Sequence, residues 1–233
     1  GDYLVLPCST TYRIVPDTLD NFFLVIESKG EFEPPESGPP GRQALYDAAA
    51  VVTPEPDPHL VEEDGWEWEV RILADGAFSS VFYPWDPLDV VGWKGDLTAW
   101  KINLRDLRPA ASPGAQSTFI TPGAVVRTFL QRPLKKDAKT QDVPYFHRNT
   151  DYDEFVFCHC GDLFPKDDLQ PGMAALHPRG IPHGPHAQAV SNQHNRDRTE
   201  EYAVLLDARQ PLQILESGAL VEDPDSGGSR SPE

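Results

Sequence analysis

The chain of 233 residues contains few cysteines and no long hydrophobic segment. Its three cysteines are too few for a disulfide framework, and an odd number leaves at least one unpaired. No apolar run approaches the roughly 20 residues that a membrane-spanning helix requires. The sequence does not open with a charged segment followed by an apolar one, which is the pattern of a secretory signal. These absences predict a soluble, reduced, cytoplasmic protein.

Basic residues are also scarce, since 20 lysines and arginines stand against 37 aspartates and glutamates, for a formal net charge of -17. A chain with this charge repels the phosphates of nucleic acids and the anionic surface of a membrane. We therefore predict that neither nucleic acid nor a membrane is a partner. The net charge does not select a small-molecule substrate, because a local basic pocket can lie inside an acidic surface.

Sustained helical periodicity is lacking too, and the 24 prolines are about twice the average usage. Proline interrupts both helices and central strands, so short strands and long loops are expected. Apolar or alternating segments predict strands at 3–6, 22–27, 66–73, 79–83, 117–133 (two strands around Thr121-Pro122-Gly123), 201–208 and 212–216. Residues 98–108 fit either a short helix or an irregular segment, and one helical turn is expected near 42–50. The pattern predicts an all-β sandwich or barrel.

The most informative feature is a histidine-rich region, since five of the seven histidines lie between residues 147 and 186. The region contains two spaced motifs, His147-x-Asn149-x4-Glu154-x6-Gly161 and Gly172-x5-Pro178-x-Gly180-x2-His183. The first motif places a histidine and a carboxylate on adjoining strands with a turn near 149–153. The second motif returns a strand through a Pro/Gly turn, so that its histidine can face the first pair.

Two neutral imidazoles and one carboxylate form a facial triad, which leaves coordination positions open for a substrate and O2. We therefore identify His147, Glu154 and His183 as candidate metal ligands. Their nitrogen and oxygen atoms suit Fe(II), Mn(II) or Zn(II), and the lack of thiolate ligands argues against a closed structural zinc site. Cys158 and Cys160 are two residues apart on a predicted strand, so we expect ordinary reduced thiols on the same face.

The paired motifs resemble those of the cupin superfamily, with Asn149 where many metal cupins have a second histidine and Ala187 where asparagine is common. A narrower likeness is carried by three segments, WKGDLTAWKINLRD at 93–106, VPYFHRNTDYDEF at 143–155 and LHPRGIPHGPH at 176–186. In these segments the chain is similar to the homogentisate 1,2-dioxygenase family, especially its bacterial branch. The likeness runs from residue 1 to about residue 210.

The resemblance implies a cupin barrel (a double-stranded β-helix or jelly roll), here the C-terminal half of a bicupin with long Pro-rich loops. It implies that His147, Glu154 and His183 hold Fe(II), and that the protein uses O2 to cleave homogentisate to maleylacetoacetate. Homogentisate is a small aromatic acid, and this reaction belongs to tyrosine and phenylalanine catabolism. The family also implies a homo-oligomer, either a trimer or a hexamer.

Five further residues are candidates for the site. The family has a histidine six residues before the last ligand, so the resemblance implies that His177 lies near the iron without ligating it. Lys94 stands where the animal enzymes have a histidine that acts as acid or base. It either hydrogen-bonds an anionic hydroxyl, acts as a base or is an exposed loop charge, and this departure bears on the substrate more than on the metal. Tyr145, Arg148 and Asn149 are predicted to line the pocket or contact the substrate, with structural packing or pairing as the alternative.

The first residues of the chain repeat the second motif. Gly1-x5-Pro7 has the spacing of Gly172-x5-Pro178, which places Ser9 at the position of Gly180 and Tyr12 at that of His183. This predicts a bicupin whose first copy has lost its metal histidine, in an N-terminally truncated chain that begins within that copy. The expected domains are a degenerate cupin remnant (1–29), a connecting region with a hairpin (30–112), the metal-binding cupin (113–217) and a disordered tail (218–233).

Other functions share the same ligand chemistry. A related cupin dioxygenase would act on gentisate or another hydroquinone. A cupin isomerase or decarboxylating oxidase would use Mn or Zn in the same three-ligand site. A non-catalytic cupin commonly lacks metal ligands, whereas all three are present here.

Overall fold

The computed structural model shows a protein built from short β-strands. It describes residues 1–35, 46–55, 67–88, 98–109, 116–134, 145–163, 169–185, 191 and 195–223. The strands within these residues are β1 (Asp2–Val5), β2 (Trp68–Ala74), β3 (Ala77–Tyr83), β4 (Trp100–Asn103), β5 (Gln116–Thr121), β6 (Ala124–Phe129), β7 (Asp153–Cys160), β8 (Ala174–His177) and β9 (Tyr202–Ala208). The helical elements are two 3-10 turns, Ala48–Ala50 and Leu104–Asp106, and a four-residue helix α2, Glu216–Ala219. The all-β prediction is confirmed.

The chain forms two compact units. The first unit comprises Gly1–Tyr3, Ser28–Ala50 and Asn103–Glu233, and the second comprises Leu4–Glu27 and Val51–Ile102. Among the described residues of both units, no helix is both long and apolar enough to cross a membrane. The four domains expected from the sequence stay a prediction.

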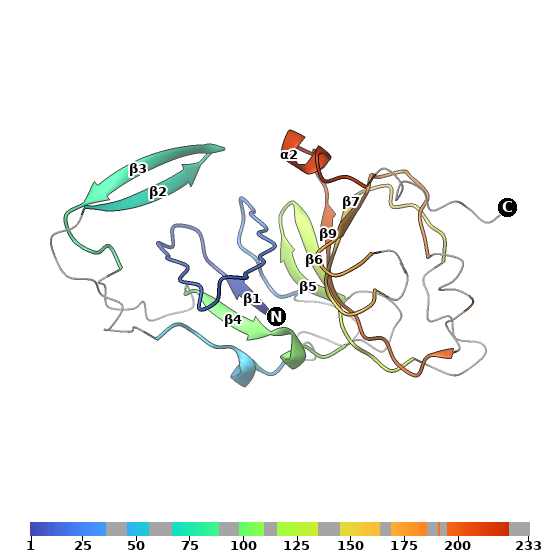
Figure 1. Cartoon of the computed structure of the whole chain (residues 1–233). Helices are drawn as coiled ribbons and strands as arrows, with labels where there is room; N and C mark the ends of the chain where they lie inside the picture. Colours follow the sequence, from blue (N-terminus) through green and yellow to red (C-terminus); the bar gives the residue numbers. More distant parts are fainter. Residues whose placement is uncertain are drawn as a thin grey trace. The chain divides into compact units, whose positions relative to one another are not determined.

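The first unit contains a five-stranded antiparallel sheet in the order β5-β6-β9-β7-β8. Figure 1 shows β9 between β6 and β7. One face of this sheet carries the apolar core, which consists of Val156, Cys158, Leu163, Leu169, Ala203 and Leu205. On the other face, the ring of Tyr3 packs edge-on against Phe119 with centroids 5.1 Å apart, and its hydroxyl lies 2.8 Å from Oγ1 of Thr128. Both faces of the sheet are therefore covered, which fixes the strand register.

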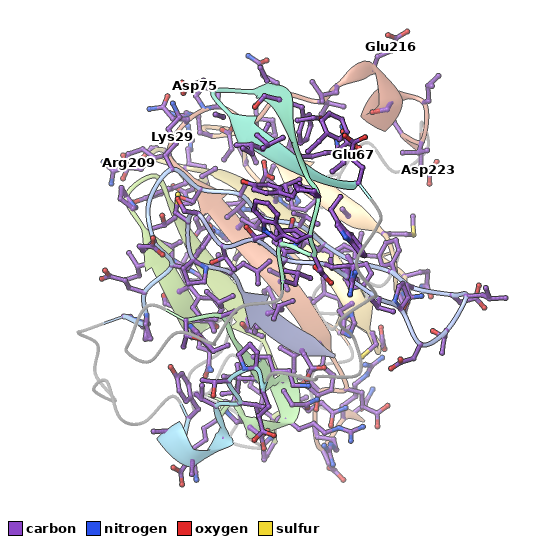
Figure 2. All side chains as sticks on the ribbon, turned by 90° about the vertical axis from the view of Figure 1, so that its left-hand side faces the viewer. Lys29, Glu67, Asp75, Arg209, Glu216 and Asp223 are labelled. Carbon is purple, nitrogen blue, oxygen red and sulfur yellow. The ribbon has the colours of Figure 1, made fainter. Side chains whose placement is uncertain are left out.

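The second unit contains the antiparallel hairpin β2–β3. Its turn residues Asp75 and Gly76 have φ angles of 49° and 77°, and Figure 2 labels Asp75 at the hairpin tip. Two residues with positive φ match the right-handed twist of the flanking strands, which is why Asp-Gly suits this position. The guanidinium of Arg13 lies 5.5 Å from the ring centroid of Trp68 in β2. The hairpin predicted from the alternating sequence is confirmed.

Other strand predictions had mixed outcomes. The pair around Thr121-Pro122-Gly123 is confirmed as β5 and β6, and the open segment 98–108 forms β4 followed by a 3-10 turn. The strand predicted at 22–27 was wrong, because the structure shows no strand pairing there, and Phe22, Phe23 and Val25 are exposed. The strand predicted at 212–216 was also wrong, because the backbone N–H of Leu212 donates to the carboxylate of Asp153 instead of entering a ladder.

The predicted internal repeat corresponds to two turns of the same geometry. Thr10 N donates to the carbonyl of Pro7 at 3.3 Å, and Ile181 N donates to the carbonyl of Pro178 at 3.2 Å. The third residue of each turn has a positive φ, 64° at Ser9 and 81° at Gly180. Glycine adopts this conformation at no steric cost, whereas serine rarely does. The two turns therefore share their hydrogen bond and their positive φ, although only the second has glycine at this position, and the repeat itself stays a prediction.

Candidate metal centre

The two histidine motifs meet through a backbone bridge. His147 N donates to the carbonyl of His183 at 2.9 Å, and His183 N donates to the carbonyl of His147 at 2.8 Å. This close approach of the two segments requires glycine at position 184, because a Cβ added to Gly184 would lie 2.6 Å from the ring of Phe146. The predicted turn therefore does bring His183 to face the first motif.

Glu154 completes the group from the second position of β7. One ligand atom from each of His147, Glu154 and His183 lies within 4.8 Å of the other two. Atoms bound to one transition-metal ion at about 2.2 Å can be at most about 4.4 Å apart. Only a small side-chain adjustment separates the observed arrangement from a coordinating one.

Backbone carbonyls set the tautomers of both imidazoles. His147 Nδ1 lies 2.9 Å from the carbonyl oxygen of Tyr145, and His183 Nδ1 lies 3.1 Å from that of Ile181. A carbonyl oxygen only accepts hydrogen bonds, so each Nδ1 carries a proton. Each Nε2 is therefore the atom available to a metal, an arrangement typical of metal-binding histidines.

The carboxylate of Glu154 is held ionised between two partners. Its Oε1 accepts from Asn149 Nδ2 at 2.9 Å, and its Oε2 lies 3.0 Å from His183 Nε2. Burial raises the pKa of Glu154, but in the metal-free protein the hydrogen bonds from the doubly protonated ring of His183 and from Asn149 outweigh burial and lower this pKa to about 2. With Nδ1 of His183 already protonated, its Nε2 and Oε2 of Glu154 face each other as two acceptors unless a proton or a metal ion lies between them. The donor set therefore fits a divalent cation.

The three side chains differ in exposure, with His183 buried, Glu154 half-buried and His147 exposed. A site closed on one side and open on the other suits a metal that must also admit a ligand from solvent. The described cysteines are not part of it, since Cys158 lies in the apolar core and Cys8 and Cys160 are exposed. The donors are therefore two nitrogens and one oxygen.

Comparison with known proteins finds relatives that are named as dioxygenases. No protein-family model matches the chain. A protein of Saccharolobus solfataricus, named provisionally as a dioxygenase, is 27% identical over 234 residues, which cover 96% of this chain and 60% of that protein. Homogentisate 1,2-dioxygenases of Nitrobacter hamburgensis and Rhodopseudomonas palustris are 26% and 27% identical, and each alignment covers 94% of this chain and 52% of the relative. The chain thus spans half to three fifths of the length of these relatives. It is a distant relative of the homogentisate 1,2-dioxygenases.

The predicted resemblance to the homogentisate 1,2-dioxygenases is confirmed at this distant level. A solved structure, a cupin-2 domain protein from Shewanella frigidimarina, covers 43% of this chain with 14% identity and a TM-score of 0.27. A likeness of that size carries no argument about the fold. The all-β class rests instead on the strands and sheet described above.

His177 lies beside the triad without belonging to it. It is the strand partner of Glu154 across β8 and β7, and its ring stacks on that of His183 with centroids 4.5 Å apart and an interplanar angle of 18°. These contacts fit a residue that supports the ligands from the side. A role toward oxygen or the substrate stays a prediction.

The other predicted residues are spread more widely. Asn149 donates to Glu154 and accepts from the backbone N–H groups of the next turn, so its contacts orient a ligand. Tyr145 is 71% exposed and touches the ring of His147 edge-on, while Arg148 is exposed. Their substrate contacts stay predictions, and Lys94 lies outside the described residues.

Cys158 and Cys160, which were expected to lie on the same face of a strand, lie in different environments. Cys158 is fully buried and Cys160 is exposed, because the pairing of β7 with β9 shifts register between them. Such an irregularity breaks the alternation of side chains along a strand. Gly161, the last residue of the first motif, has a φ of 82°, and a Cβ there would lie 1.7 Å from the carbonyl oxygen of Glu200. That position accepts glycine alone.

Sequence reasoning missed three charged residues on β7, β9 and β6, the strand of Glu154 and the two strands that follow it across the sheet. Asp153 is 4% exposed and accepts from the backbone N–H groups of Arg179 and Leu212 at 2.9 Å and 2.8 Å. Asp207 is the strand partner of Glu154 and pairs with Arg127 at 2.8 Å. The available signal was a charge inside an apolar strand, as in VVRTF and VLLDA. Lysine, arginine, aspartate and glutamate are rarely buried without a partner.

Proposed function

We propose that this protein is an Fe(II)-dependent dioxygenase that cleaves the ring of homogentisate. The observation that carries the proposal is the convergence of His147, Glu154 and His183, whose ligand atoms lie within 4.8 Å of one another. The dioxygenase names of the distant relatives support the reaction class. The chain spans only part of those relatives, so both the activity and the substrate are inferred.

The reaction consumes one homogentisate and one O2 and forms one maleylacetoacetate, with both oxygen atoms retained in the product. A bound Fe(II) would supply a Lewis acid for the substrate and a one-electron path to O2. The residues of the chain supply its placement. The two Nε2 atoms and the carboxylate would hold the ion, Asn149 fixes the carboxylate, and the exposed side at His147 would admit the substrate.

Related substrates form the second candidate function. Lys94 stands in the WKG segment, where the family resemblance implies a histidine, so gentisate or a substituted hydroquinone is the natural alternative substrate. Lys94 is proposed to hydrogen-bond the distal hydroxyl or to act as a base there. The same ligand set suits Mn(II) or Zn(II), which would support a cupin isomerase.

The proposal is tested by loading the protein with Fe(II) without oxygen and following O2 uptake with homogentisate, gentisate and methylhydroquinone. We expect uptake equal to the ring-cleaved product, fastest with homogentisate. Glu154→Ala serves as the matched control, since it removes a ligand while leaving the apolar core of the sheet intact. Turnover that needs Mn(II) and consumes no O2 would overturn the proposal in favour of the isomerase. A trimeric or hexameric assembly is part of the proposal and is read from light scattering.

A further inference from the structure

Arg127 is a charge that the proposed chemistry has not yet used. It is the one lysine or arginine in the five strands β5 to β9, all of which the structure describes in full. The chain as a whole carries a formal charge of -17. A cation placed on a rigid strand within such a chain requires a specific reason.

The strand register places Arg127 on the face that carries the metal ligands. One row of paired residues crosses β8, β7, β9 and β6 through His177, Glu154, Asp207 and Val125. The adjacent row consists of Ala175, Val156, Leu205 and Arg127. The second row is apolar apart from Arg127, whose side chain leans into the first row to reach Asp207. The guanidinium therefore lies in the same polar row as Glu154.

Asp207 anchors one edge of that guanidinium. Arg127 Nε lies 2.8 Å from Asp207 Oδ2, and the side chain of Asp207 is only 3% exposed. Nε itself is buried, yet the Arg127 side chain as a whole is 43% exposed. Arginine has five N–H donors in a fixed fork, so an arginine held at Nε can still offer its Nη edge to a carboxylate.

The spacing suits a small aromatic acid. Glu154 and Arg127 lie on strands separated only by β9 and in adjacent rows, so their backbones are about 12 Å apart, from two strand spacings and an offset of two residues. Both side chains extend over the same face, so their charged ends can approach more closely than the backbones do, as a ligand with one ring and a short acidic side chain would require. We propose that Arg127, held by Asp207, binds the anionic group of the substrate and selects acidic over neutral hydroquinones. The inference rests on the proposed function, because it assumes an aromatic ligand at the triad.

The rival explanation is that Arg127 only neutralises the buried Asp207. Removing Arg127 alone would leave a buried charge without its partner, which can unfold the protein. The test therefore uses the double variant Arg127→Gln/Asp207→Asn, which removes both charges together. Arg127→Lys is the matched variant that keeps the positive charge but lacks the fork.

Binding is measured by calorimetry without oxygen on the Fe(II)-loaded protein, with homogentisate and with methylhydroquinone, which has a methyl group in place of the acidic side chain. We expect the double variant to bind homogentisate about 10- to 100-fold more weakly, the effect of one charge-assisted contact. The affinity for methylhydroquinone should change by less than about threefold. The affinity of Arg127→Lys for homogentisate should lie between those of the wild type and the double variant.

Equal losses for both ligands, or an unchanged preference for homogentisate in the double variant, would overturn the role of Arg127. The second outcome would mean that the metal alone recognises the carboxylate. A wild-type protein with no preference for the acidic ligand would overturn it as well. An acid preference that depends on Arg127 without any O2 uptake would uphold this inference and refute the dioxygenase proposal, so the two failures are distinguishable.

Discussion

Asn149→Ala is the most informative single substitution, because the Asn149 side chain links a turn to a ligand. Its Nδ2 donates to Glu154 at 2.9 Å, and its Oδ1 accepts from the backbone N–H groups of Asp151 and Tyr152 at 3.0 Å and 3.1 Å. The bond to the carboxylate is charge-assisted and contributes about 1.5–3 kcal/mol, and each bond to the exposed turn contributes about 0.5–1 kcal/mol. The free energy of unfolding should therefore fall by about 2.5–5 kcal/mol.

The same change frees Glu154 to rotate, so metal affinity should fall about 10- to 100-fold, as for other groups that orient a ligand. Urea denaturation of the metal-free protein measures the first effect, and Fe(II) titration against a competing chelator measures the second. Thr150→Ala, one residue away in an exposed position of the same turn, is the control and should change neither. A variant that loses stability but binds Fe(II) as tightly as the wild type would refute the orienting role. If Asn149 also contacts substrate, KM will rise in the fully metal-loaded variant.

Three further substitutions test separate parts of the account. Ser9→Gly should raise the free energy of unfolding by up to about 1 kcal/mol, because serine is strained at a φ of 64°. Gly180→Ser should lower this free energy for the same reason. A destabilising effect of Ser9→Gly in urea denaturation would contradict the prediction. Asp153→Ala should lower the free energy of unfolding by about 3 kcal/mol, since two partly buried backbone N–H groups lose their charged acceptor. A loss below about 1 kcal/mol in thermal denaturation would contradict this prediction. Lys94→Ala should leave iron content unchanged and lower kcat. Unchanged kinetics would favour the alternative that Lys94 is an exposed loop charge without a role in the reaction.

The site was more predictable from the sequence than the fold around it. His147, Glu154 and His183 could be identified because ligand chemistry requires particular residue types, and because the Pro/Gly turn limits where the chain can return. The structure brings these three side chains together as the two motifs predict. Hairpins joined by Asp-Gly or Pro-Gly were equally accessible, since the turn residues determine the pairing of neighbouring strands.

Features that depend on distant pairing were not accessible. The apolar segment 22–27 resembles a strand, but it lacks a strand partner among the described residues. The register of three strands far apart in sequence pairs Glu154 with Asp207 and puts Arg127 in the adjacent row, from which it reaches Asp207. Local patterns contain no information on which strands become neighbours, so the role of these charges emerged only from the sheet.

The most direct test of the central claim is an Fe(II) titration of the wild-type protein and of Glu154→Ala, carried out without oxygen, with circular dichroism as a check on folding. The account predicts one tightly bound Fe(II) per wild-type chain and loss of that binding in a variant that keeps its β-sheet spectrum. Equal iron binding by the two folded proteins, or no binding by the wild type, would show that His147, Glu154 and His183 do not form a metal centre.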